Sequence, residues 1–433
     1  MASRKQLLTG ITHTDACIAR CKEIYGASSD IMHQQLRYEE IIARHYASYK
    51  EYTFLETHLF STAGRTELGG NHTDHNLGKV IAASINLDTI AVASRIEENK
   101  VILISPGFSD VVVDITSLNV VESEKNTTAS LVRGIAHAFL MRGLVIGGLI
   151  IHTTTNVLKG SGLSSSAAIE VLIATIFNSM FNNDILEPVE LAIISQYAEN
   201  VYFGKPSGLM DQIACAVGNV VKIDFKDPKN PIVTSVPVDF LKSGYQLMII
   251  DTKGDHADLG DDYAAIPKEM KMVANFFGKS VLREITLEQF TSSIQEIRNA
   301  INNDRALLRA YHFLLENERV DAMHKALLND DIALYLDLVK ASGASSLHFL
   351  QNIYTPIHPL VQPITLALMM CDQLLGSDGA ARVHGGGFAG TVQVYVPLAL
   401  CDIFTQKAKS VFGDDSVTPL VVRGVPTCQV DTF

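Results

Sequence analysis

KGSGLSSSAAIE, residues Lys159–Glu170, joins a predicted strand to a predicted helix through a loop of glycine and serine residues. The preceding segment Gly147–Asn156 (GGLIIHTTTN) is rich in β-branched side chains, which are typical of a strand. A loop of this kind brings backbone N–H groups to a helix N-terminus, where together they can hold a phosphate group. The alternative interpretation is a helix N-cap with extra serines. Two further glycine-rich segments in the chain favour the phosphate loop.

The composition of the chain is that of a globular protein. It has 433 residues, of which 47% are hydrophobic and 19% are charged, and this length predicts two domains. The formal net charge of −12 argues against a general nucleic-acid-binding protein, which needs a basic surface. A nucleotide can still bind, because backbone dipoles hold phosphate groups even within an acidic protein.

The ends and the cysteines of the chain favour a cytoplasmic protein. Arg4 and Lys5 are not followed by the apolar run of a signal peptide, and no apolar run has the length of a membrane span. The six cysteines are scattered, which favours reduced thiols over a disulfide framework. We expect no membrane partner and no nucleic-acid partner, and the sequence leaves the oligomeric state open.

The order of the predicted elements favours an α+β fold, because strands and helices alternate without regular βαβ repetition. Residues 1–53 are expected to form a helical N-terminal extension, residues 54–240 a first domain and residues 241–433 a second. The expected strands are Thr89–Ile96, Val101–Ser105, Val111–Ile115, Leu149–Thr155, Tyr245–Asp251 and Thr391–Val396. The expected helices are Thr128–Met141, Ser165–Met180, Glu187–Tyr202 and Ile364–Leu374.

The segment Ala63–Gly78 (AGRTELGGNHTDHNLG) concentrates charged and amide side chains among four glycines. So many hydrogen-bonding groups are costly to bury without partners, but they suit a small ligand with several hydroxyl groups. The alternative interpretation is a solvated loop.

The segment Ala198–Gln212 (AENVYFGKPSGLMDQ) places two carboxylates around glycine turns. Glu199 lies on a helix that is expected to end near Phe203, with Gly204 as its C-cap. Asp211 follows a second glycine turn in an apolar neighbourhood, and we expect its burial to raise its pKa. Such a carboxylate can act as a base or orient a hydroxyl group. The alternative for Asp211 is a helix N-cap.

The segment Arg382–Gly390 (RVHGGGFAG) carries three consecutive glycines before a predicted strand. Consecutive glycines indicate backbone that approaches another group closely or adopts positive φ angles. Conformational freedom at the start of a strand explains them equally well.

Taken together and in this order, the segments resemble the GHMP small-molecule kinase superfamily, and most closely its galactokinase branch. Gly64–Asn76 (GRTELGGNHTDHN) is similar to the family's GRVNLIGEHTDYN, and Gly162–Ala168 matches GLSSSAA letter for letter. Gly204–Gln212 matches the family's G-x-x-x-G-x-MDQ segment, and Gly385–Gly390 matches its GGGFGG turn. The matches extend over most of the chain from residue 54 onward.

This resemblance implies two domains with the active site in the cleft between them, and ATP-dependent phosphorylation of the anomeric C1 hydroxyl group of a sugar. It implies Asp211 as the catalytic aspartate with Arg65 beside it, and most of the catalysis would come from positioning and electrostatics. It also implies Mg²⁺ held by Ser166 and Glu199, whose hard oxygens suit that ion. The ATP phosphates would contact Gly160, Ser161, Gly162, Leu163, Ser164, Ser165 and Ser166. The sugar would contact Glu67, Asn71, His72, Asp74 and Tyr263.

The chain departs from the family pattern in the sugar motif. Asn71 stands where galactokinases carry glutamate, His75 where they carry tyrosine, and Glu67 where they carry asparagine. An amide both donates and accepts, whereas a carboxylate only accepts, so such changes can alter substrate choice. We therefore expect a sugar 1-kinase with galactose as the leading substrate. The alternatives are a kinase for another hexose, an amino sugar or a uronic acid, and a sensor that binds ATP and sugar without turnover.

Overall fold

The computed structural model describes residues 10, 12–26, 30–49, 52, 54–158, 160–254 and 259–431. The signal-peptide expectation concerns residues that lie almost entirely outside these ranges, as does Lys159 at the start of the phosphate loop. Within the described ranges, no helix combines the length and the hydrophobicity needed to cross a bilayer.

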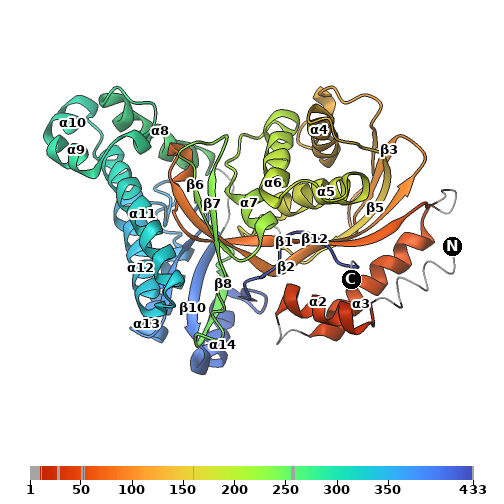
Figure 1. Cartoon of the computed structure of the whole chain (residues 1–433). Helices are drawn as coiled ribbons and strands as arrows, with labels where there is room; N and C mark the ends of the chain where they lie inside the picture. The colour runs from red at the N-terminus through yellow and green to blue at the C-terminus, as the bar shows by residue number, and fades with distance from the viewer. Residues whose placement is uncertain are drawn as a thin grey trace.

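An eight-stranded sheet, counted over the described residues, forms the centre of the N-terminal half (Figure 1). Its main path runs β12-β1-β2-β5-β3-β4, and β6 pairs with β2 and β7. Every pairing is antiparallel except that between β3 and β5. The strands are β1 (Thr57–Gly69), β2 (Lys79–Ile96), β3 (Lys100–Ile104), β4 (Val111–Asp114), β5 (Gly148–Thr155), β6 (Val220–Asp224), β7 (Ile232–Val236) and β12 (Cys428–Gln429).

Helices cover both faces of this sheet, which explains why β1 and β2 are buried along nearly their whole length. β2 is largely apolar, as expected for a strand buried on both faces, whereas β1 also buries polar side chains such as Arg65 and Glu67. One face carries α4 (Thr128–Met141), α5 (Ser165–Asn182), α6 (Pro188–Tyr197) and α7 (Met210–Val217). The other face carries α2 (Asp15–Tyr25) and α3 (Ile31–Ala47), which belong to the N-terminal extension.

A second, four-stranded sheet in the described residues has the order β11-β8-β10-β9 and is antiparallel throughout. Its strands are β8 (Tyr245–Asp251), β9 (Ala380–His384), β10 (Thr391–Pro397) and β11 (Val417–Leu420). The helices of this half are α8 (Gly260–Phe276), α9 (Leu287–Ser292), α10 (Ile294–Ile301), α11 (Asp304–Leu328), α12 (Ile332–Ser345), α13 (Pro363–Leu375) and α14 (Cys401–Phe412).

The two halves share a hydrophobic core. Val220 and Ile223 of the first sheet belong to the same buried cluster as Leu247 and Ile249 of the second. The end of the chain also returns to the first half, because β12 pairs with β1. The expected boundary at residue 240 falls between β7 and β8, and the division into domains stays a prediction.

Most of the expected elements occur within a few residues of their predicted bounds, and the α+β class is confirmed. The helix expected at Glu187–Tyr202 differs from the prediction because only its first part is α-helical. Its α-helical part begins at Pro188, where Glu187 and Glu190 form a capping box, and ends at Tyr197. A π-helical turn, η3 (Ala198–Phe203), follows, with Gly204 as its C-cap at φ 87°. Such turns are common at functional sites, and this one carries Glu199.

The buried carboxylate of Asp88 connects the N-terminal extension to the sheet. Asp88 is fully buried on β2, and its carboxylate accepts hydrogen bonds from Tyr25 (2.7 Å), Ser61 (2.6 Å) and Arg37 (3.0 Å). Arg423 lies 4.0 Å away and donates to Ser61. Because the carboxylate is out of contact with water, its charge depends on these partners.

Replacing Asp88 with alanine should destabilise the protein by about 3–5 kcal/mol, because Arg37 and Arg423 would then be buried without a carboxylate. Urea unfolding followed by circular dichroism measures this difference. The control is Asp337→Ala, which removes a carboxylate that is 74% exposed and should change stability by less than about 0.5 kcal/mol. Equal effects of the two substitutions would contradict a structural role for Asp88.

Candidate active site

The phosphate loop occupies the turn between β5 and α5, as the sequence predicts. Gly160, Gly162 and Ser164 have positive φ angles of 79°, 70° and 59°. No side chain caps the N-terminus of the 18-residue helix α5, which begins at Ser165. Its first N–H groups therefore remain available to an anion, with the positive end of the helix dipole behind them.

Contacts from both halves of the molecule hold the loop in place. Arg65 N on β1 donates to Leu163 O at 3.0 Å, and Thr391 Oγ1 on β10 donates to Ser161 O at 3.3 Å. Ser161 Oγ in turn donates to Leu158 O at 2.7 Å. The loop is therefore fixed relative to β1 and to the second sheet before any ligand binds.

Arg65 and Asp211 form a bidentate ion pair beside this loop. Arg65 Nε lies 2.7 Å from Asp211 Oδ1, and Nη2 lies 2.8 Å from Oδ2. The remaining Nη1 donates to Gly162 O, and Ser164 Oγ donates to Asp211 Oδ2. The pair thus connects β1, the phosphate loop and the first turn of α7. A bidentate arginine–carboxylate pair fixes orientation as well as charge.

The structure corrects the expectation that burial raises the pKa of Asp211. Burial alone acts in that direction, but the attraction of Arg65 and the hydrogen bonds from Arg65 and Ser164 outweigh it and lower the pKa below its usual value. The N-cap alternative is also wrong, because Leu209 occupies the N-cap of α7 without a side-chain cap. Asp211 lies within the first turn, with 33% of its side chain exposed.

The first half of Ala63–Gly78 is a buried strand, not a solvated loop. Glu67 is 5% exposed, and its Oε1 accepts hydrogen bonds from Arg382 at 2.6 Å and Asn71 at 3.1 Å. Burial raises the pKa of Glu67 although Arg382 opposes the shift. Glu67 and Arg382 therefore link β1 of the first sheet to β9 of the second.

The residues predicted to contact the sugar converge on the glycine turn Gly385–Gly387. Asn71 Nδ2 donates to Gly385 O at 2.7 Å, His72 Nε2 to Gly386 O at 2.9 Å and the Tyr263 hydroxyl to Gly387 O at 2.9 Å. Residues 255–258, which precede Tyr263 in the chain, lie outside the described residues. Burial and the neighbouring His75 lower the pKa of His72 to about 4, so His72 is neutral at pH 7.

Asn71 is the most completely enclosed of these residues. It is 1% exposed, and its Oδ1 accepts a hydrogen bond from Asn352 Nδ2 at 2.8 Å. Its main-chain oxygen lies 2.9 Å from His312 Nε2. The Asn71 side chain thus holds Glu67, Gly385 and Asn352 together, and its contact with the sugar stays a prediction.

Asp74 lies apart from the glycine turn, against the segment that carries Asp211. A Cβ atom at position 208 would collide with the Asp74 carboxylate, so Gly208 permits this close approach. Asp74 also lines a cavity of about 310 Å³ with His75, Gln196, Ser207 and Phe225. A polyhydroxylated ligand could reach its carboxylate from this cavity.

The residues expected to hold a metal ion lie on α5 and η3. Ser166 is exposed in the first turn of α5. The Glu199 carboxylate receives hydrogen bonds from Lys205 (3.0 Å), Gln212 (2.8 Å) and Ser207. In the described part of the chain, no group of three or more His, Cys, Asp and Glu side chains could hold a metal ion. Mg²⁺ does not require such a cage, because it keeps several waters and shares its coordination with substrate phosphates.

Sequence reasoning missed the buried polar groups that support the site. His384 accepts a hydrogen bond at Nε2 from Glu67 N (3.3 Å), so its proton lies on Nδ1, which donates to Thr391 Oγ1 at 2.9 Å. Burial and the nearby Arg65 lower the pKa of His384 well below its usual value. Gln212 Nε2 also donates to Glu170 (3.0 Å), whose pKa burial raises well above its usual range. His384 and Gln212 lie within the segments Arg382–Gly390 and Gly204–Gln212, but nothing in those segments indicated their hydrogen-bond partners.

Substitution of Asn71 by glutamate should destabilise the protein rather than alter its specificity. The carboxylate cannot donate to Gly385 O, and it would face the Glu67 carboxylate. Each lost buried hydrogen bond costs about 1–3 kcal/mol, so we expect a fall of several degrees in the thermal midpoint. Scanning calorimetry measures it, with Asn302→Glu at an exposed helix end as the control. A glutamate variant as stable as the wild type would show that Asn71 is not enclosed as described.

Two family models match the segments of the chain that carry these groups. The model of the GHMP kinases N terminal domain matches residues 130–219, which include the phosphate loop, Glu199 and Asp211. The galactokinase galactose-binding signature matches residues 45–95, which include β1 and the turn that carries Asn71.

Solved structures of kinases share the fold. The galactokinase of Lactococcus lactis, complexed with galactose, is 23% identical, with a TM-score of 0.75 over 89% of this chain and 98% of that one. The mevalonate kinase of Methanococcus jannaschii is 14% identical, with a TM-score of 0.59 over 85% and 99% of the two chains. The Streptococcus pneumoniae phosphomevalonate kinase is 13% identical, with a TM-score of 0.56 over 84% and 98%. The chain therefore matches the GHMP kinases N terminal domain over residues 130–219 and the galactokinase galactose-binding signature over residues 45–95, and it has the fold that these kinases share.

Proposed function

We propose that this protein is a cytoplasmic, ATP-dependent kinase that transfers the γ-phosphoryl group of ATP to the C1 hydroxyl group of galactose. The observation that carries the proposal is the Arg65–Asp211 pair, which lies in contact with both Gly162 and Ser164 of the phosphate loop. The galactose-binding signature over residues 45–95 supports galactose as the acceptor.

In this reaction, the sugar hydroxyl oxygen forms a bond to the γ-phosphorus while the bond between that phosphorus and the β,γ-bridging oxygen breaks. Asp211 orients the hydroxyl group and receives its proton as the new P–O bond forms. Arg65 stabilises the negative charge on the transferring group and on the sugar oxygen. Because Arg65 lowers the pKa of Asp211, that carboxylate is a weak base in the resting enzyme, and positioning contributes more than proton abstraction.

The groups proposed to bind ATP, the sugar and Mg²⁺ are residues already described around the Arg65–Asp211 pair. The backbone of Gly160–Ser166 would hold the ATP phosphates, and Asp74 would accept hydrogen bonds from sugar hydroxyls. Mg²⁺, held by Ser166 and Glu199, would neutralise charge on the phosphates when bound. The donor set suits this ion, since it supplies one hydroxyl and one carboxylate, and Mg²⁺ commonly takes its remaining ligands from water and substrate phosphates.

An assay with a panel of sugars distinguishes this proposal from two alternatives, a kinase for another sugar and a sensor that binds without turnover. ADP release is measured with Mg²⁺-ATP and galactose, glucose, N-acetylgalactosamine, arabinose or galacturonic acid. Turnover with another member of the panel but not with galactose would keep the mechanism and change the substrate. Sugar binding without turnover would favour a sensor. The intact ion pair and the uninterrupted GLSSSAA loop favour turnover with galactose.

Asp211→Asn should lower kcat by about 10³-fold, because the amide neither forms the bidentate pair with Arg65 that positions it nor receives the proton, while changing the affinities for ATP and galactose by less than about tenfold. Calorimetric titration separates binding from turnover. The control Asp378→Asn, at an exposed position, should leave all three quantities unchanged. A rate close to that of the wild type would remove Asp211 from the mechanism.

The expected pH dependence of kcat/KM follows from the lowered pKa of Asp211. Its pKa in the folded protein lies below the unfolded value of about 3.9. The stabilisation by the ion pair is therefore present above that value and is lost only as the pH falls through the lower, folded pKa. We expect kcat/KM to show no acid-side loss between about pH 8 and pH 5. An inflection near pH 6 that followed the ionisation of Asp211 would contradict the pairing with Arg65.

A further inference from the structure

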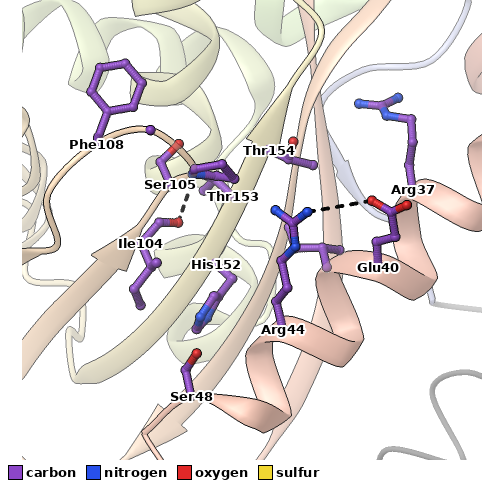
Figure 2. Close-up of a pocket in the computed structure, with 13 residues that line it drawn as sticks. Arg37, Glu40, Arg44, Ser48, Ile104, Ser105, Phe108, His152, Thr153 and Thr154 are labelled. Atoms are coloured by element: carbon purple, nitrogen blue, oxygen red, sulfur yellow. Dashed lines mark hydrogen bonds and ion pairs between the residues drawn. The ribbon is translucent and has the colours of Figure 1, made fainter.

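A cavity of about 360 Å³ lies on the face of the first sheet that carries α3, opposite the face that carries the phosphate-binding helix α5 (Figure 2). One wall is α3, and the other comprises His152–Thr154 of β5 and the segment Ile104–Phe108 at the end of β3. Its volume is that of a small-molecule site. We call this cavity the α3 pocket.

The helical wall of the α3 pocket is positively charged. Arg37, Ile41, Arg44 and Ser48 follow one another at intervals of four, three and four residues, which places them on one side of the helix. Figure 2 shows Arg44 reaching from α3 toward the strands. Its only ion pair among the described residues is with Glu40 at 3.9 Å, and 58% of its side chain is exposed. Arg37 is paired with the buried Asp88 at 3.0 Å, so the positive charge that faces the cavity is mainly that of Arg44.

Two buried nitrogen atoms of the pocket residues have no hydrogen-bond partner in the described structure. They are Arg37 Nη2 and His152 Nε2. Arg37 uses its Nη1 for Asp88 and Gln34, and His152 uses its Nδ1 for His45 at 2.9 Å. His152 is 4% exposed. Buried polar atoms without partners are rare in native proteins, and they indicate a missing water, ion or ligand.

Hydroxyl groups line the remaining wall. The side chains of Ser48, Ser105 and Thr154 make no hydrogen bond to other described residues, whereas Thr153 Oγ1 donates to Ile104 O at 3.4 Å. Phe108 lies at the rim and is 67% exposed. Burial lowers the pKa of His152 to about 4, so the positive charge of the pocket at neutral pH comes from the arginines. Arginine and hydroxyl donors around one cavity are the groups that bind phosphate esters.

We propose that the α3 pocket binds the phosphate group of a small phosphorylated metabolite, with Arg44 and Arg37 as its cationic partners and the hydroxyl groups of Ser105 and Thr154 as further donors. This ligand site is separate from the phosphate loop and does not depend on the kinase proposal. The cavity accommodates a sugar phosphate or a nucleoside monophosphate, and the rim position of Phe108 allows contact with a base or a sugar ring.

The test is calorimetric titration of the full chain with inorganic phosphate, galactose 1-phosphate and AMP at low ionic strength. We expect at least one of the three to bind, and Arg44→Glu to weaken that binding by at least about tenfold, the value of one charge-assisted contact. Preference for inorganic phosphate, the sugar phosphate or AMP identifies the source of the phosphate group. Thr154→Val, which removes only a hydroxyl group, should weaken the same binding less.

The matched control is Arg298→Glu, since Arg298 is 65% exposed and pairs with an acidic neighbour, as Arg44 does. It lies on α10, at the other end of the molecule from α3 (Figure 1), and should leave the binding unchanged. Binding that is equally tight in the wild type and in Arg44→Glu would overturn the proposal, because the probes would then occupy the phosphate loop or another site. Failure of all three probes to bind at millimolar concentration would also overturn it.

Discussion

The ion pair between Arg65 and Asp211 is the contact on which the site depends. Arg65 is buried and depends on the Asp211 carboxylate to balance its charge, whereas 33% of the Asp211 side chain is exposed. The arginine arises from a strand, the aspartate from the first turn of a helix, and both contact the phosphate loop. The Arg65–Asp211 pair therefore fixes the Asp211 carboxylate, which would contact the sugar hydroxyl, relative to the phosphate loop, which would hold the transferring phosphoryl group.

Buried polar contacts extend this arrangement into the second half of the molecule. Glu67 pairs with Arg382, and His384 joins the backbone of β1 to Thr391. Asn71 and His72 hold the carbonyl groups of the glycine turn. These directional bonds, together with the shared apolar core, specify the relative position of the two sheets. On the far side of the first sheet, Asp88 ties the N-terminal helices to the strand beside β5, from which the phosphate loop begins.

Much of the fold and of the candidate site could be predicted from the sequence, because the segments that form them are each specified by neighbouring residues. The loop before α5, the strand Tyr245–Asp251 and the turn around Gly204 are specified by residues close together in the chain. Long-range partners were not predictable in the same way. The pKa of Asp211 is lowered because Arg65 contacts it, and Arg65 is 146 residues away in the sequence. The bonds of Asn71 to Gly385 and Asn352 likewise join residues far apart in the sequence, and its contact with the sugar stays a prediction. His384 carried no signal of its own, since its role depends on strands that meet only in the fold.

The central claim is that the groups around Arg65 and Asp211 direct a phosphoryl group to the anomeric oxygen of galactose. The most direct test is ³¹P and ¹³C NMR of the product formed from galactose and Mg²⁺-ATP. The account predicts a single sugar phosphate whose phosphorus is coupled to C1 of galactose. A phosphate on another carbon, or no sugar phosphate while ATP and galactose both bind, would contradict it.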